Sequence, residues 1–388
     1  MRLAFCIFKY FPFGGLQRNF LDIAQALVHR GHDITVYTTH WDGAVPPGLN
    51  LKHVSVSRLT NHERMHQFAS TVCARLPHEQ FDAVVGFNKM PGLDVYYAGD
   101  PCYEVLTRRR HDERLGPFTW VRWLNPRYHR YRSLERAVFN PQAKTHILML
   151  STTQEREYIG QYGTQQARCH QLPPSMLADR QPIADQARTR QEFRQQWRIP
   201  EDEFVLLMTG SCLKTKGLDR AIHAFSSLPA ATRLRCRLLT VGDNRARSFL
   251  PLAKKLGMHN RIQICGPQTD IPAFMVGSDV LIHPAYTDNT GTVLLESMAY
   301  ALPSVVTAVC GYAHYIREAN AGTVLTSPFA QASLNRALLD MLSSPHRIQW
   351  GKNGADFIKT LDLSSRAYHA AAIVEAVARE RAYALATP

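Results

Sequence analysis

Short apolar runs alternate with stretches of helical periodicity along most of this 388-residue chain, and the alternation restricts the fold more than any single motif. In the second half, five strand-like runs are each followed by a helical pattern; they cover residues 204–208, 237–241, 262–265, 280–283 and 304–308. Strands that alternate with helices form parallel sheets with crossover helices. The sequence therefore predicts an α/β fold.

The first half of the chain repeats this alternation. Its predicted strands cover residues 2–10, 34–39, 53–56, 83–87, 146–150 and 170–172, and its predicted helices cover 16–30, 63–76 and 152–162. A proline pair at 173–174 opens a polar stretch that is typical of a linker. We therefore expect two domains, at residues 1–172 and 173–363, followed by a long amphipathic helix within residues 364–388.

The cysteines and the N-terminal residues indicate in which cellular compartment the protein is expected. The eight cysteines are scattered, with no CxxC pair and no histidine at ligand spacing, which argues against a structural zinc site and against a disulfide framework. The apolar run at the N-terminus ends at Lys9, too early for a signal sequence or a membrane span. We expect a protein of the reducing cytosol.

The charge balance points to an anionic partner. The chain has 45 Lys and Arg against 32 Asp and Glu, a formal net charge of +13. Residues 103–136 hold nine arginines and four acids, interleaved with tryptophans, tyrosines and a phenylalanine. Arginines with interfacial aromatics suit a surface that lies on anionic lipid, and the same composition suits single-stranded nucleic acid. A solvated basic helix remains a third interpretation of this segment.

Residues 283–296 join a strand end, a polar turn and a helix start, and they read HPAYTDNTGTVLLE. Asn289, Thr290 and Gly291 offer helix-capping chemistry, and a helix N-terminus suits phosphate or sugar hydroxyls. Asp288 and Glu296 would lie about 12 Å apart along a helix, whereas the two acids of a glycosidase lie roughly 5 to 9.5 Å apart. Two separate contacts along one long ligand fit this spacing better.

Two further loops end in helices. Gly14 and Gly15 follow the first predicted strand, but the loop lacks the GxGxxG pattern, which removes the main argument for a nicotinamide dehydrogenase. The loop at 210–217 reads GSCLKTKG. Its Lys214 and Lys216 stand before a helix, where cations stabilise the charge of a leaving diphosphate.

Four stretches carry a resemblance to a known family. The segment at 283–296 resembles the acidic signature of retaining family 4 glycosyltransferases of the GT-B fold. FPFGGLQRNF, GFNKMPGLDVYYAGDPCY and CGYAHYI are similar to the lipopolysaccharide core glucosyltransferases within that family. The resemblance implies two Rossmann-like domains that face a central cleft, with the C-terminal helix returning to the first domain.

The resemblance also implies roles for individual residues. The expected catalytic residues are Asp100, Asp288 and Lys216. The expected donor-binding residues are Gly14, Gly15, Ser211, Lys214, Lys216, Gly266, Pro267, Asn289, Thr290, Gly291, Thr292 and Glu296. The residues expected to contact the acceptor or the membrane are Lys89, Arg108, Arg109, Arg110, Trp120 and Trp123. The sequence departs from the family pattern at Asp288, where the signature has glutamate, and at Thr215, where an arginine often stands.

The resemblance predicts a retaining, metal-independent transfer of a hexose, expected to be glucose, from a UDP-sugar to a heptose of the lipopolysaccharide inner core. The UDP-sugar is a co-substrate, and no cofactor, metal or nucleic-acid partner is expected. The enzyme would lie peripherally on the anionic cytoplasmic face of the inner membrane. Two other classes remain open: a GT-B sugar-nucleotide epimerase, and a non-catalytic basic protein that binds membranes or nucleic acid.

Overall fold

A computed structural model describes the chain except for residues 13, 116–122, 243 and 387–388. Its contacts divide the chain into two compact units. Unit 1 consists of Met1–Pro174 with the segment that begins at Ser364, and unit 2 consists of Ser175–Leu363. The sequence predicted the first boundary after residue 172 and the second after residue 363.

Unit 1 contains a seven-stranded sheet in the order β3-β2-β1-β4-β5-β6-β7, and every strand pair is parallel. Its strands are β1 (Arg2–Cys6), β2 (Asp33–Thr38), β3 (Leu49–His53), β4 (Ala83–Gly86), β5 (Val95–Tyr97), β6 (His146–Met149) and β7 (Cys169–Gln171). The central strands β1, β4 and β5 are buried along almost their whole length, as expected for a parallel sheet that helices cover on both faces.

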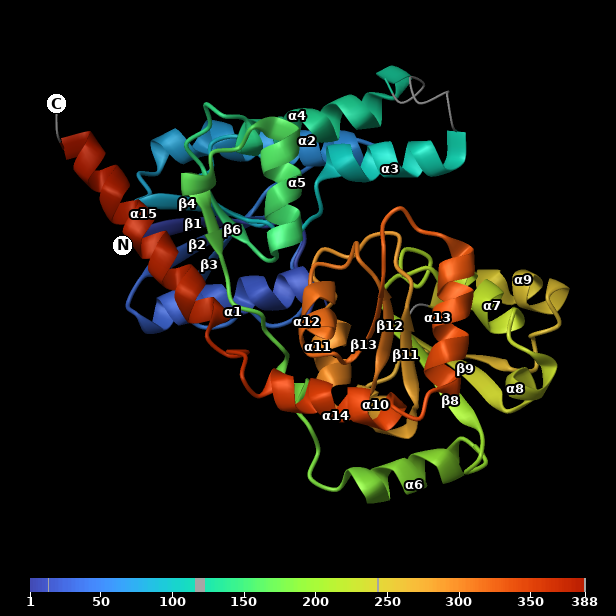
Figure 1. Ribbon diagram of the computed structural model, residues 1–388. Coiled ribbons are helices and arrows are strands. Elements are labelled where there is room, and N and C mark those ends of the chain that lie inside the picture. The colour runs from blue at the N-terminus through green and yellow to red at the C-terminus, as the bar shows by residue number, and fades with distance from the viewer. Residues whose placement is uncertain (13, 116–122, 243, 387–388) are drawn as a thin grey trace. The chain divides into compact units, whose positions relative to one another are not determined.

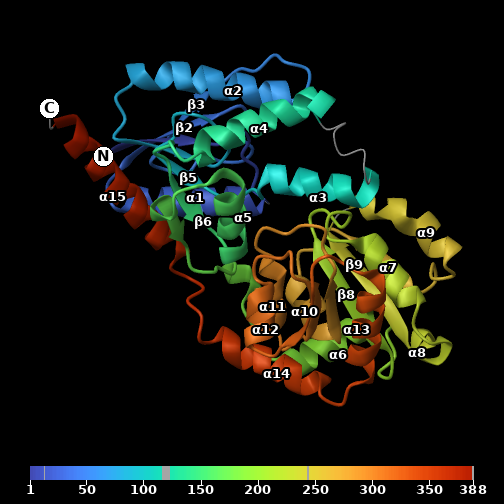
Figure 2. The same cartoon turned by 45° about the horizontal axis from the view of Figure 1, so that its top comes forward.

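The helices of unit 1 form two layers (Figures 1 and 2). They are α1 (Gly15–His29), α2 (Asn61–Arg75), η1 (Leu76–His78), α3 (Tyr103–Leu115), α4 (Pro126–Phe139), α5 (Thr152–Tyr162), η3 (Gln166–Arg168) and α15 (Arg366–Ala386). One hydrophobic core contains residues of α1 and α15, and a second contains residues of α2, α4 and α5.

The C-terminal helix α15 packs on α1, so the end of the chain belongs to the fold of unit 1. Its Ala370, Ala371 and Val374 are fully buried. Glu375 lies 2.7 Å from His32 Nε2 and 3.2 Å from the guanidinium of Arg30, which fixes the helix against the chain that follows α1.

Unit 2 contains a six-stranded parallel sheet in the order β10-β9-β8-β11-β12-β13. Its strands are β8 (Phe204–Gly210), β9 (Cys236–Gly242), β10 (Ile262–Gly266), β11 (Val280–His283), β12 (Ser304–Thr307) and β13 (Gly322–Leu325). Its helices are η4 (Ala178–Arg180), α6 (Gln186–Gln196), α7 (Leu218–Ser226), α8 (Ala230–Leu234), η5 (Asn244–Phe249), α9 (Leu250–Lys255), α10 (Ile271–Gly277), α11 (Thr292–Ala299), α12 (Ala313–Glu318), α13 (Gln331–Ser343) and α14 (Arg347–Ile358).

The predicted α/β class with parallel sheets is confirmed, and the errors concern short or edge strands. The strand predicted at 53–56 lies at Leu49–His53, because this edge strand is largely exposed and has little apolar signal. Strands β5 and β13 were missed. β5 lies between stretches rich in glycine, proline and aspartate, and β13 is a partly buried edge strand, so neither gives a clear apolar run. Among the described helices, none is long and apolar enough to cross a membrane.

Candidate active site

Two loops of unit 2 meet at the carboxyl ends of neighbouring strands. β8 and β11 pair in the sheet, so the loop after β8 and the turn after β11 emerge at the same edge, where α/β proteins bind ligands. The amide of Tyr286 donates to the carbonyl of Thr215 at 2.9 Å. Gly217 has φ of +82°, and a Cβ there would lie 2.2 Å from the carbonyl oxygen of Pro284. The close approach of the two loops therefore requires glycine.

Asp288 receives two partners at this edge. Lys216 Nζ lies 2.7 Å from its Oδ2, and Nε2 of His283 lies 2.8 Å from the same oxygen. Burial alone would raise the pKa of Asp288, but the Lys216 ammonium and the His283 ring outweigh it and hold the pKa well below its usual range. Asp288 is therefore a carboxylate across the physiological pH range.

The ligand atoms of His283, Asp288 and Cys310 lie within 4.8 Å of one another, a grouping that the sequence did not predict. Lys216 already supplies the positive charge next to Asp288. Burial raises the pKa of the Cys310 thiol well above its ordinary value, because the ionised sulfur would be poorly solvated there. This chemistry favours an acid neutralised by a lysine, and we assign no metal to the group.

Both helices at this edge begin without a side-chain cap. α7 begins after Gly217 and α11 begins after Gly291, each in the left-handed conformation and with no cap hydrogen bond from its side chain. The positive ends of their dipoles suit an anionic ligand. The sequence offered Asn289 and Thr290 as further caps, but the N-cap of α11 is Gly291.

The turn before α11 is held by the segment that follows β12. The carbonyl of Asp288 accepts from Gly311 N at 3.1 Å, and the carbonyl of Thr290 accepts from Tyr312 N at 2.7 Å. Thr292 is exposed at the start of α11. Glu296 lies further along the same helix and is 9% exposed. Asp288 and Glu296 thus occupy the start and the body of one turn-helix unit.

The remaining predicted donor residues of unit 2 lie in loops at strand ends. Ser211 and Lys214 are exposed in the loop between β8 and α7. Gly266 ends β10 with φ of +67°, and a Cβ there would lie 2.8 Å from Asn244 Oδ1. Pro267 is exposed after it. In a parallel sheet these strand ends share one edge with the Lys216–Asp288 pair.

In unit 1, Gly14 is the N-cap of α1 and Gly15 is its exposed first residue. A Cβ at Gly14 would lie 1.9 Å from Gln17 Oε1. Gln17 in turn donates from Nε2 to the carbonyl of Lys9 at 3.1 Å. α1 also begins without a side-chain cap, so the first helix of unit 1 starts like α7 and α11 of unit 2.

Lys89 and Asp100 belong to a polar cluster of unit 1 centred on Glu135, which is fully buried. The ammonium of Lys89 contacts the Glu135 carboxylate and lies 2.8 Å from the carbonyl of Pro101. Glu135 also accepts from Tyr103 N at 2.7 Å and from the Tyr162 hydroxyl at 2.7 Å. Lys89 is therefore neutralised by an internal acid.

A cavity of about 390 Å³ adjoins this cluster. It is lined by Met65, Asn88, Lys89, Asp100, Pro101, Tyr103, Leu106, Arg127, Tyr131 and Leu134. The carbonyl of Asp100 accepts from Gln154 Nε2 at 3.0 Å and from the Tyr158 hydroxyl at 3.2 Å, which fixes the backbone while the side chain stays at the cavity.

Asp100→Asn is expected to stabilise unit 1 at pH 7. Burial raises the pKa of Asp100, Lys89 lowers it less, and the net direction is upward. Ionisation of Asp100 therefore costs folding free energy above its unfolded pKa, and that cost disappears as the pH falls. In urea unfolding, the variant should have the higher midpoint at pH 7, with the difference shrinking toward pH 4. A lower midpoint at pH 7 would contradict the assigned direction.

The predicted membrane residues have unlike environments. Arg108 is exposed and donates to Gln161, whereas Arg109 pairs with Glu157 at 2.8 Å. Arg110 lies in α3, and Trp120 falls outside the described residues. Trp123 is 42% exposed, and the guanidinium of Arg132 lies 5.0 Å from its ring.

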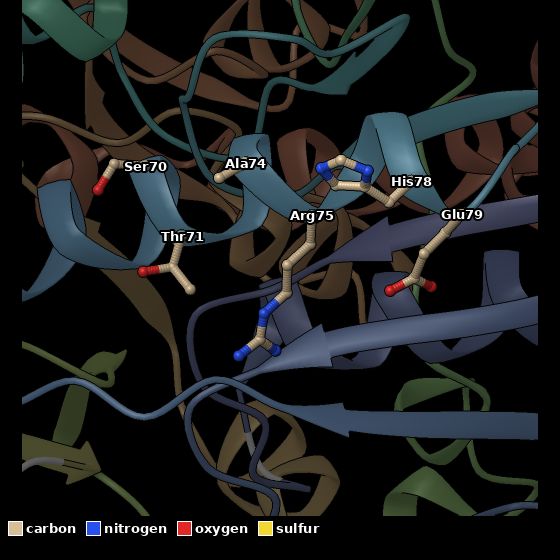
Figure 3. A pocket seen from close by; sticks show the side chains of 6 residues that line it. All are labelled: Ser70, Thr71, Ala74, Arg75, His78 and Glu79. Atoms are coloured by element: carbon tan, nitrogen blue, oxygen red, sulfur yellow. The ribbon is translucent and has the colours of Figure 1, made fainter.

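A second hollow, of about 490 Å³, lies on α2 and η1 (Figure 3). Its lining residues are Ser70, Thr71, Ala74, Arg75, His78 and Glu79. None of the residues predicted from the sequence lines it. We therefore do not include it in the candidate site.

Sequence reasoning missed the residue that holds the turn after β11. The guanidinium of Arg220 lies 3.5 Å from the ring centre of Tyr286 and 3.8 Å from that of Phe329. It donates to the carbonyls of Pro284 and Ala285 at 3.3 and 3.2 Å. A lone arginine in a helix start gives no pattern that would mark it, and His283 was likewise included only as a strand end.

Comparisons with known proteins fit this arrangement. A family model described as glycosyl transferases group 1 matches residues 189–357, and one described as Glycosyltransferase Family 4 matches residues 13–176. The lipopolysaccharide glucosyltransferase WaaG of Escherichia coli (strain K12) is 40% identical over 375 residues, which cover 96% of this chain and 98% of WaaG.

Solved structures also resemble the chain. A crystal structure of WaaG, a glycosyltransferase involved in lipopolysaccharide biosynthesis, superposes with a TM-score of 0.85 and covers 96% of this chain and 99% of its own. Anabaena HepE in complex with UDP-glucose is 16% identical, covers 100% of both chains and gives a TM-score of 0.67, which shows a shared fold.

Proposed function

We propose that this chain, which belongs to the GT-B glycosyltransferases of family 4, transfers a hexose from a UDP-sugar to a heptose of the lipopolysaccharide inner core. Glucose is the expected hexose, because the full-length relative at 40% identity is a lipopolysaccharide glucosyltransferase. The observation that carries the proposal is the contact between Lys216 and Asp288, at 2.7 Å, beside the uncapped starts of α7 and α11.

In the proposed reaction, the bond between the anomeric carbon and the diphosphate oxygen breaks, and UDP leaves with the bonding electrons. The acceptor hydroxyl forms the new bond on the same face of the sugar, and its proton passes to the diphosphate. Lys216 and the positive end of the α7 dipole would stabilise the growing charge on the diphosphate. Asp288 would hold the hexose, and Glu296 would accept hydrogen bonds from the ribose hydroxyls. The reaction needs no metal or cofactor besides the UDP-sugar.

Calorimetry with UDP, ADP and GDP tests the donor part of this proposal. UDP should bind at least tenfold more tightly than ADP or GDP. Equal affinities would contradict a uridine donor, and no binding of any nucleotide would favour the alternative of a non-catalytic basic protein. A GT-B epimerase would turn over the UDP-sugar without an acceptor. Turnover of the UDP-sugar in the absence of an acceptor is measured with the same protein preparation.

We further propose that the basic surface of α3 and α4 lies on the anionic cytoplasmic face of the inner membrane. Arg127 and Arg136 of α4 are exposed, like Arg108 of α3. Exposed apolar side chains accompany them at Trp123 and Leu124, which are 42% and 71% exposed. Cationic and apolar side chains on one segment suit the charged headgroups and the interface below them.

Changing Arg108, Arg127 and Arg136 to glutamine should weaken binding to anionic vesicles about a hundredfold. Each arginine near such a surface contributes about 1 kcal/mol, and every 1.4 kcal/mol is tenfold in affinity. Arg109 is left unchanged because its ion pair with Glu157 belongs to the fold of unit 1. Cosedimentation with anionic and neutral vesicles measures the effect.

The matched control removes the same charge from unit 2 by changing the exposed Arg317, Arg336 and Lys352 to glutamine. This control should keep wild-type vesicle binding. An equal loss in both variants would show that net charge alone drives binding. Equal binding of the wild-type protein to anionic and neutral vesicles would contradict the membrane proposal and would favour the interpretation of α3 and α4 as a solvated basic surface.

A further inference from the structure

We propose that His283 is a positioning residue that fixes the carboxylate of Asp288 for transfer, an inference that rests on the proposed function. His283 is the last residue of β11, and its side chain is 1% exposed. Its Nε2 lies 2.8 Å from Asp288 Oδ2, five residues further along the chain. The hydrogen bond joins a buried strand end to the turn that precedes α11.

The two partners of Asp288 share one of its oxygens. Both Lys216 Nζ and His283 Nε2 contact Oδ2, at 2.7 and 2.8 Å. Among the residues that the structure describes, none makes a hydrogen bond or an ion pair with Oδ1. Holding Oδ2 from two sides sets the plane of the carboxylate and leaves Oδ1 as the oxygen available to a sugar hydroxyl.

His283 and Lys216 differ in how they can respond to a ligand. The lysine ammonium is carried by a flexible four-carbon stem, so it can shift toward a diphosphate. The imidazole of His283 has two side-chain torsions and is packed at the end of a central strand. When the lysine is drawn toward the donor, the histidine keeps Asp288 in its orientation.

The other ring nitrogen of His283 supports a role beyond packing. Nδ1 is buried and has no hydrogen-bond partner among the described residues. The carboxylate can only accept, so Nε2 is the donor in this hydrogen bond, and Nδ1 takes no part in it. A buried polar atom without a partner costs folding free energy, so packing alone does not account for an imidazole at this position.

Asp288 is one methylene shorter than the glutamate of the family signature, and the contacts fit that difference. A shorter acid keeps its carboxylate close to its own backbone, within reach of the strand that ends at His283. The position of the carboxylate then depends on the strand end as well as on the turn. His283, at the end of an apolar strand, therefore helps to determine where the carboxylate of Asp288 lies.

The variants His283→Gln and His283→Met test the proposal as a matched pair. Both side chains are unbranched and similar in length, but only glutamine can donate a hydrogen bond to Asp288. We expect His283→Met to lower kcat about 10- to 100-fold, the effect of losing one hydrogen bond to a charged group. His283→Gln should stay within about threefold of wild type. UDP affinity should stay within about twofold in both, because the proposed ribose contact is Glu296.

Thermal unfolding of both variants separates a positioning role from a role in folding. A positioning role lowers kcat while the variant remains folded. His283→Met should stay folded at the assay temperature while its kcat falls, because Lys216 still pairs with Asp288. Equal kcat values for the two variants would overturn the positioning role, and so would a loss of kcat that follows a loss of stability. If the wild-type protein neither binds UDP nor transfers sugar, the proposed function fails instead.

Discussion

Replacing Lys216 with methionine is expected to lower kcat for sugar transfer about 100-fold or more. Methionine keeps much of the stem that lies over Gly210 but removes the ammonium that contacts Asp288. Preorganised positive charge acts most strongly where negative charge develops, and here the charge develops on the leaving diphosphate. Affinity for the intact UDP-sugar should fall less than kcat, because the diphosphate of the donor carries less negative charge in the ground state than in the transition state.

The control for this variant is Lys254→Met, an exposed lysine on α9 of the same unit. It should keep wild-type kcat and wild-type UDP affinity. Single-turnover kinetics with saturating UDP-sugar measures the chemical step separately from product release. Near-normal turnover in Lys216→Met would mean that another group stabilises the leaving diphosphate.

Replacing Glu296 with alanine is expected to weaken UDP binding by about 1.5 to 3 kcal/mol, the range for hydrogen bonds to a charged group. Glu296 is 9% exposed in α11, so its carboxylate is held within the helix layer rather than in free solvent. Without the Glu296 carboxylate, the ribose hydroxyls lose a charged acceptor, and water cannot fully replace it at a buried position. Calorimetry with UDP and with uracil nucleoside monophosphate measures the loss.

Glu296→Gln is the conservative control, because it keeps the shape and one acceptor oxygen but removes the charge. Its UDP affinity should lie between those of wild type and Glu296→Ala. Unchanged UDP affinity in Glu296→Ala, with folding intact by thermal unfolding, would remove the ribose contact from this account. An equal loss for the uracil and adenine nucleotides would place the effect on ribose rather than on the base.

Much of the fold could be predicted because it depends on local patterns. The alternation of apolar runs with helical periodicity identified both parallel sheets, and the predicted helix at 152–162 matches α5 (Thr152–Tyr162). The resemblance to family 4 is confirmed by the full-length relative at 40% identity. What failed was the short strand: β5 is only Val95–Tyr97 and is fully buried. Its place in the sheet depends on its neighbours rather than on its own sequence.

The site was less predictable, because its key contacts join distant parts of the chain. No local pattern indicated that Lys216 would contact Asp288, 72 positions away. The same holds for Arg220, whose guanidinium lies between Tyr286 and Phe329 and holds the carbonyl of Pro284. Lys89 was expected at the acceptor or the membrane, and in the fold its ammonium contacts the buried Glu135. These partners meet only when distant segments fold together, which local patterns do not show.

A transfer assay tests the central claim most directly. The full-length protein is mixed with a panel of UDP-sugars and with lipopolysaccharide truncated at the inner-core heptose, and the modified acceptor is identified by mass and by anomeric configuration. The proposal predicts one added hexose, highest activity with UDP-glucose, and an α-linkage from the α-configured donor. UDP-sugar turnover that is independent of the acceptor, or no transfer from any UDP-sugar, would contradict it.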